Sequence, residues 1–270
     1  MGASHSYTSN FFTITMIDRS TELLTIANEH DMYETKVSTD IQNNIARRKY
    51  NYKPYDLTDK QHDELEYYFF SSIFTKLPRR LIIDVDYVNV VCMVPSADAG
   101  MPHTRPGNII CIPYGVLPSF ETIIHELWHI HQRKYPHIWN KFFNEQWYFK
   151  EWTTGRLPNS IDAQRRFNPD TIDSPLWIWK NEWVPVPIMT NITTPSLRDT
   201  DIWFFNIQSG SLLTDGNPPA EMKSFFSENI NHIAYEHPKE MSAYMLSIPS
   251  FRHSEHTPGY NRLIREMGKI

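Results

Sequence analysis

The sequence is poor in several features that mark whole classes of protein. Its two cysteines are too few for a disulfide framework, so Cys92 and Cys111 are predicted to be buried thiols. It has no block of basic residues and a formal net charge of −5, which argues against nucleic acid as the main partner. No run approaches the ~18 uncharged apolar residues of a membrane-spanning helix, and the first residues lack the basic and apolar regions of a signal peptide. These absences predict a cytoplasmic protein without a transmembrane segment.

The features that are present indicate an ordered, globular chain. Hydrophobic residues make up 40% of the 270 residues and aromatic residues 14%, which excludes a disordered protein. At roughly 100–200 residues per domain, this length predicts one large domain or two closely packed lobes.

The first six residues, Met-Gly-Ala-Ser-His-Ser, fit the pattern for N-myristoylation of Gly2, with Ser6 at the required position. A flexible terminus of small residues is the simpler explanation, because six residues are a loose pattern. A single acyl chain without a polybasic stretch would give only weak membrane association. If Gly2 is acylated, the protein belongs in the cytoplasm of a eukaryotic host or in a virus that replicates there.

Residues 1–56 have little periodicity, and the regular patterns begin after them. Thr58 and Gln61 form a capping box that opens a predicted helix to about residue 76. Residues 81–94 are rich in Ile and Val and predict a strand, and residues 108–112 predict a second, short strand. Ser119 is the predicted N-cap of the next helix, which ends before Pro136, and another helix is expected over 137–149.

The second half is rich in proline and tryptophan. All eight tryptophans lie between positions 128 and 203, which fits an aromatic core or, less commonly, an aromatic-lined cleft. Helical patterns return at 219–229, after Pro238 and at 258–268. Pro238 suits a first helical turn, where its missing N–H would be unpaired anyway.

The segment that carries chemistry is His125-Glu126-Leu127-Trp128-His129, an H-E-x-x-H motif inside the predicted helix 119–135. Four residues advance a helix by about 400°, so His125 and His129 project from one face and can reach one Zn²⁺. Glu126 lies about 100° from His125, where it can take the proton of an activated water molecule. An amphipathic helix that carries these residues on its surface by chance is the alternative reading.

This motif resembles the signature of the zincin metallopeptidases, and the order of elements over residues 81–135 is similar to theirs. The resemblance implies an α+β fold with a small mixed sheet and an active-site helix. It also implies that the strand at 108–112 is an edge strand that pairs with an extended substrate.

The third metal ligand is less certain than the first two. The metzincin subclass is excluded, because Gln132 and Tyr135 stand where it has glycine and histidine, and His131 points away from the pair. The segment 236–244 resembles the glutamate helix of gluzincins, in which a small residue follows three positions later, as Ala243 does. This favours Glu240 as the ligand, with Glu236, His232 and His237 as alternatives; a first-turn glutamate favoured by the helix dipole explains Glu240 without metal.

The remaining candidates are weaker. Residues that could stabilise an oxyanion follow the presumed ligand helix: Tyr244, His253, His256, Tyr260 and Arg262. His103 precedes the strand at 108–112 and could line a cleft. Asn168-Pro169-Asp170 predicts an Asx-type turn without chemistry.

We therefore predict a zinc-dependent metallopeptidase that binds one Zn²⁺ through His125, His129 and Glu240, uses Glu126 as general base, and acts on a peptide or protein substrate. Residues 1–56 would be an extension of uncertain structure. Residues 57–150 would form the zincin-like lobe, and residues 151–270 a mostly helical lobe that supplies the third ligand. The size and the possible acyl site also resemble proteins of large DNA viruses of eukaryotes. A catalytically inactive binding or virion structural protein with this fold, or a zinc hydrolase of a non-peptide amide or ester, are the alternatives.

Overall fold

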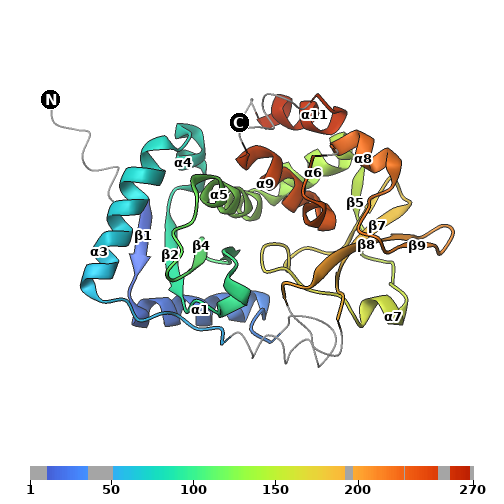
Figure 1. The fold of residues 1–270 in the computed structure, drawn as a ribbon. Coiled ribbons are helices and arrows are strands. Elements are labelled where there is room, and N and C mark those ends of the chain that lie inside the picture. The colour runs from blue at the N-terminus through green and yellow to red at the C-terminus, as the bar shows by residue number, and fades with distance from the viewer. Residues whose placement is uncertain (1–10, 36–50, 192–196, 228, 249–255, 268–270) are drawn as a thin grey trace. The chain divides into compact units, whose positions relative to one another are not determined.

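The computed structural model describes residues 11–35, 51–191, 197–227, 229–248 and 256–267 (Figure 1). The chain forms two compact units. The described residues of the first are 11–35 and 51–134, and those of the second begin at Tyr135. Helices occur with one small mixed sheet and one antiparallel sheet, which confirms the α+β class. None of the helices in these ranges combines the length and the apolar character needed to span a bilayer.

The first unit has a four-stranded sheet in the order β1-β2-β4-β3. Its strands are β1 (Phe12–Thr15), β2 (Val88–Met93), β3 (His103–Arg105) and β4 (Ile109–Pro113). The first two strands and β4 run parallel, and β3 is antiparallel to β4. Both β1 and the following helix α1 (Ile17–Asp31) come from the N-terminal stretch that shows little periodicity.

Helices cover both faces of this sheet, as the alternation of side chains along a strand requires. Val90 and Cys92 pack in a core with residues of α3, α4 and α5, whereas Val91 and Met93 pack against α1. These helices are α3 (Asp59–Tyr68), α4 (Arg79–Val85) and α5 (Phe120–Lys134). Both cysteines are buried free thiols, as predicted.

Two expectations about strands in this unit are wrong. Residues 81–94 are not one strand, because α4 occupies their first part and β2 begins only at Val88. Pro78 precedes the helix, and Leu81 and Val85, four residues apart, are both buried while Ile83 is exposed, so the local spacing is helical. The strand predicted at 108–112 exists as β4, but it lies between β2 and β3 and is not an edge strand.

The edge beside β4 is β3, only three residues long. The chain reverses between the two strands through Gly107 and Asn108, both with positive φ. A strand this short has too little alternation for a sequence pattern to reveal it, which is why the edge was misplaced.

The helices predicted in this unit are present. The capping box of Thr58 and Gln61 opens α3, which continues through a π-helical turn (Phe69–Ile73) and a 3₁₀ turn (Phe74–Lys76). Ser119 Oγ accepts a hydrogen bond from the Thr122 backbone N–H at 3.1 Å, so it caps the N-terminus of α5.

The second unit contains a five-stranded antiparallel sheet in the order β5-β6-β7-β8-β9, which the expectation of a mostly helical lobe did not include. Its strands are β5 (Phe149–Glu151), β6 (Trp177–Trp179), β7 (Trp183–Met189), β8 (Thr200–Asn206) and β9 (Leu212–Leu213). Pro185 and Pro187 interrupt the run of strand-forming residues in β7, so the sequence did not indicate a strand there. They are tolerated because β7 pairs along its length with β8, while its other edge pairs with β6 only at Trp183 and then meets residues 164–166 of a loop.

The helices of the second unit are α6 (Pro136–Trp147), α7 (Asn159–Asp162), α8 (Ala220–Phe226), α9 (Pro238–Ser247) and α11 (Pro258–Met267), with a 3₁₀ turn at His232–Glu236. Pro238 occupies the first turn of α9, as predicted. Four tryptophans are almost fully buried, namely Trp139, Trp147, Trp177 and Trp179. The aromatic cluster is therefore mainly core.

Candidate metal centre

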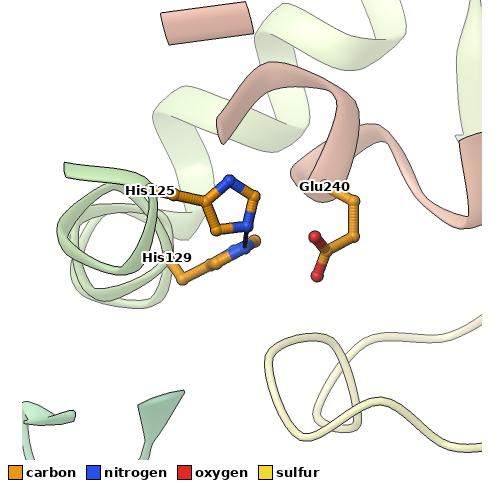
Figure 2. A group of neighbouring side chains, drawn as sticks. All are labelled: His125, His129 and Glu240. Carbon is orange, nitrogen blue, oxygen red and sulfur yellow. Dashed lines mark hydrogen bonds between the residues drawn. The ribbon is translucent and has the colours of Figure 1, made fainter. Parts of the chain in front are cut away.

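The H-E-x-x-H motif lies in the middle of α5, and the helix sets the direction of both imidazoles. His125 Nε2 and His129 Nε2 face one another at 3.0 Å, and the two rings meet edge to face (Figure 2). Two nitrogens bound to one tetrahedral zinc at 2.0–2.1 Å would be about 3.3 Å apart. The spacing of the pair therefore fits two ligands of one small cation.

The second nitrogen of His129 is held by a residue that the sequence analysis did not single out. Its Nδ1–H donates to Gln132 Oε1 at 3.0 Å, and both side chains are buried. This bond leaves the proton on Nδ1 and the lone pair on Nε2, which is the tautomer that binds a metal. The sequence could have shown this pair, because His129 and Gln132 are three residues apart and such residues are neighbours on a helix.

Glu126 is also buried, with 4% of its surface exposed, on the same helix turn. Its place next to His125 follows from the helix, as the sequence predicted. His131 is buried and lies 3.7 Å from Asp84 of α4. Burial lowers the pKa of His131 to about 4, so it stays neutral and serves as packing within the first unit.

Glu240 lies in the first turn of α9, in the second unit, and is mostly buried. One of its oxygens accepts a hydrogen bond from Asn168 Nδ2 at 2.8 Å. Ala243, the predicted small residue, is fully buried on the same helix. Among the described residues, His125, His129 and Glu240 are a group that could hold a metal ion. The histidines belong to the first unit and the glutamate to the second.

Asn168 also donates to Glu236, so one amide holds two carboxylates of the second unit. Burial raises the pKa of Glu236 to about 7, and the Arg166 guanidinium opposes this rise. The Asx turn predicted at 168–170 is confirmed by a bond from the Asp170 N–H to Asn168 Oδ1 at 3.1 Å. The sequence analysis missed these two hydrogen bonds of the Asn168 amide, because Asn168 lies about 70 residues before Glu236 and Glu240.

The other candidates for the third ligand have different surroundings. His237 is the N-cap of α9, accepting from the Lys239 N–H through Nδ1, and its Nε2 lies 3.2 Å from Ser174 Oγ. His232 is exposed near Asp201. The structure thus gives both imidazoles partners within the second unit.

The residues suggested for oxyanion stabilisation are dispersed. Arg262 donates to the Gln146 carbonyl and packs over Tyr148, Tyr260 is buried, and His256 is exposed. Tyr244 is half-buried on α9. His253 and Gly2 lie outside the described residues. Of this set the structure singles out none.

His103 lies in a buried polar cluster of the first unit. Its Nδ1–H donates to the Met101 carbonyl at 3.1 Å, and its Nε2 accepts from the Tyr52 hydroxyl at 2.8 Å. These two bonds use both ring nitrogens, so His103 is a packing residue.

No family model, no curated protein and no solved structure matches the chain. The chemistry of the site has to be inferred from its own residues.

Proposed function

We propose that the protein is a zinc-dependent peptidase in which His125, His129 and Glu240 bind one Zn²⁺ and Glu126 is the general base. The observation that carries the proposal is the pair of Nε2 atoms 3.0 Å apart on α5, with the His129 tautomer fixed by Gln132. The proposal includes a zincin-like arrangement of the first unit.

When bound, Zn²⁺ would supply the positive charge that acidifies water and polarises the carbonyl group of the substrate. The histidines would hold it as neutral imidazoles, and Glu240 would add a carboxylate. Such a set leaves one tetrahedral position open, as catalytic zinc sites require and structural ones do not.

Glu126 would accept the proton of the attacking water on its carboxylate and deliver it to the amine that leaves. Its burial supports this role, because a carboxylate shielded from bulk water exchanges its proton with the reacting groups and not with solvent. The presence of a carboxylate at this position also favours an enzyme over an inactive binding protein, which has no need of a base.

Metal analysis of the purified chain tests the ligand set. We expect about one zinc per chain, and a strong loss in His125→Ala, His129→Ala and Glu240→Ala. His137→Ala is the matched control, since His137 is an exposed histidine on the next helix. If all four variants bind as much zinc as the wild-type chain, the proposal is wrong.

Turnover of a mixed peptide library tests the reaction. Glu126→Gln should keep the zinc and abolish cleavage, because it removes the base and leaves the ligands in place. If the wild-type chain binds zinc but cleaves no peptide, the activity part of the proposal is wrong. If the chain cleaves non-peptide amides or esters but no peptide, the protein is a non-peptide hydrolase.

A further inference from the structure

The carboxamide of Asn168 makes three hydrogen bonds within the second unit. Its Nδ2 group donates to a carboxylate oxygen of Glu236 and, at 2.8 Å, to Oε1 of Glu240. Its Oδ1 accepts from the Asp170 N–H at 3.1 Å. The reverse orientation would place the amide oxygen against two carboxylates and an N–H group against another N–H group. The partners of Asn168 therefore fix the direction in which its donors point.

The backbone holds Asn168 in place from both sides. Before it, the Arg166 N–H donates to the carbonyl of Pro187 in β7 at 2.8 Å, so this segment is joined to the sheet. After it, Pro169 has a fixed φ, and the Thr171 N–H donates to the Asn168 carbonyl at 3.1 Å, which closes a turn. An amide that the fold holds in this way can in turn hold a side chain to which it donates.

Glu240 is the side chain for which this matters, because it is the proposed third zinc ligand. A glutamate has several rotatable bonds, and fixing its carboxylate before the ion binds removes part of the entropy cost of binding. The charge of the donor also suits this task. A lysine or arginine would neutralise the carboxylate, whereas the uncharged amide of Asn168 holds it and leaves its negative charge in place.

We propose that Asn168 is a positioning residue that holds the Glu240 carboxylate in the orientation in which it binds zinc. The inference rests on the proposed function in one respect, that Glu240 is a zinc ligand. The competing account is that Asn168 serves only the turn that its Oδ1 and its backbone carbonyl form. Under that account the acceptor Oδ1 matters and the donor Nδ2 does not.

Asn168→Ser separates the two accounts. Serine keeps a short acceptor for the Asp170 N–H and adds no charge, but it is too short to donate to both glutamates. We expect the zinc dissociation constant of the full chain, measured by competition with a chelator of known affinity, to rise about 10–100-fold. The matched control is Asn159→Ser, because Asn159 is an exposed asparagine of α7, and its zinc affinity should equal that of the wild-type chain.

A second measurement uses the metal-free chain. The carbon-13 resonance of the Glu240 carboxyl group is assigned by its absence in Glu240→Gln. Asn168→Ser should shift this resonance, because the carboxylate loses a hydrogen bond, and Asn159→Ser should leave it unchanged. If Asn168 served only the turn, Asn168→Ser would change neither this resonance nor the zinc affinity.

Asn168→Asp decides between the two accounts if Asn168→Ser does not fold. It keeps the shape of the side chain and the Oδ1 acceptor of the turn, but replaces the donor by an oxygen that repels both glutamates. Its zinc affinity should fall by at least about tenfold. An unchanged affinity would show that the donor end of the amide has no part in metal binding.

The outcomes distinguish this inference from the proposed function. If the wild-type chain binds zinc and Asn168→Ser binds it equally well, Asn168 is not a positioning residue, while the proposed function stands. If zinc binding weakens but the Glu240 resonance does not shift, the loss does not act through Glu240, and the inference is again wrong. If the wild-type chain binds no zinc, the proposed function fails, and the role of Asn168 fails with it.

Discussion

Each unit contains a buried cluster of charged side chains, and the two clusters differ in how completely their atoms are paired. In the first unit, Arg105 donates to both oxygens of Asp31, at 2.6 and 2.9 Å, and to the Tyr52 hydroxyl at 2.7 Å. Tyr52 in turn donates to His103. We call these four residues the Arg105 cluster.

The second unit has the Glu236 cluster, made of Arg165, Arg166, Asn168 and Glu236. Here the nearest guanidinium contact of Glu236 is 3.8 Å long, and Glu236 Oε2 and Arg165 Nε lack hydrogen-bond partners. The comparison teaches that buried charge alone does not mark a functional site. A cluster whose donors and acceptors match stabilises the fold, whereas a cluster that leaves a buried donor and acceptor without hydrogen bonds lowers its stability.

The largest effect is expected from Asp31→Asn, which removes the charge from the bidentate ion pair of the Arg105 cluster. Both side chains of the pair are completely buried, so Arg105 would be left without a counter-ion, at a cost of about 3–5 kcal/mol. The measurement is hydrogen exchange of the β2 and β4 amides in urea. The control is Glu22→Gln, whose exposed ion pair with Arg19 should contribute under about 1 kcal/mol. A similar cost for both would show that the Arg105 cluster does not stabilise the fold.

A smaller loss is expected from Tyr52→Phe, which keeps the ring and removes the hydroxyl between Arg105 and His103. A hydrogen bond to a charged group contributes about 1.5–3 kcal/mol, so the same exchange experiment should register a loss of this size.

This position also predicts a pH dependence. Burial raises the pKa of Tyr52 well above its usual 10, so the unfolded chain releases this proton at a lower pH than the folded one. Stability should therefore fall as pH rises above about 10, and the fall should be smaller in Tyr52→Phe. An equal fall in both proteins would contradict the assignment of Tyr52 to the buried Arg105 cluster.

The smallest effect is expected from Glu236→Gln, the counterpart of Asp31→Asn in the Glu236 cluster. Both changes turn a buried carboxylate into an amide of the same shape. The free energy of unfolding should change by less than about 1 kcal/mol here, or rise, because the substitution removes a buried charge that is incompletely paired. Tryptophan fluorescence in urea measures it, since seven of the eight tryptophans follow Tyr135. A loss as large as that of Asp31→Asn would show that the two clusters are equivalent.

Local patterns in the sequence predicted the elements whose signals lie within a few residues. The capping box at Thr58, the Ser119 cap and the proline at the start of α9 each concern one helical turn, and all are present. The direction of His125 and His129 follows from a helix in the same way. The edge strand β3 and the strands β5, β6 and β9 of the second sheet were missed, because two- and three-residue strands are defined by their partners and not by their own residues. The seven-residue strand β7 was missed because Pro185 and Pro187 interrupt its pattern.

The sequence by itself determined the class of the fold, the helix that carries the histidine pair and the residues that could take up a proton or a metal. It could do so because helix geometry relates residues three and four apart without reference to the rest of the chain. Only the tertiary structure decided that Gln132 fixes the tautomer of His129, that Asn168 holds Glu236 and Glu240, and that Glu236 Oε2 and Arg165 Nε are buried without a hydrogen bond. Pairing and burial of polar groups depend on which distant segments meet, and no local pattern records that.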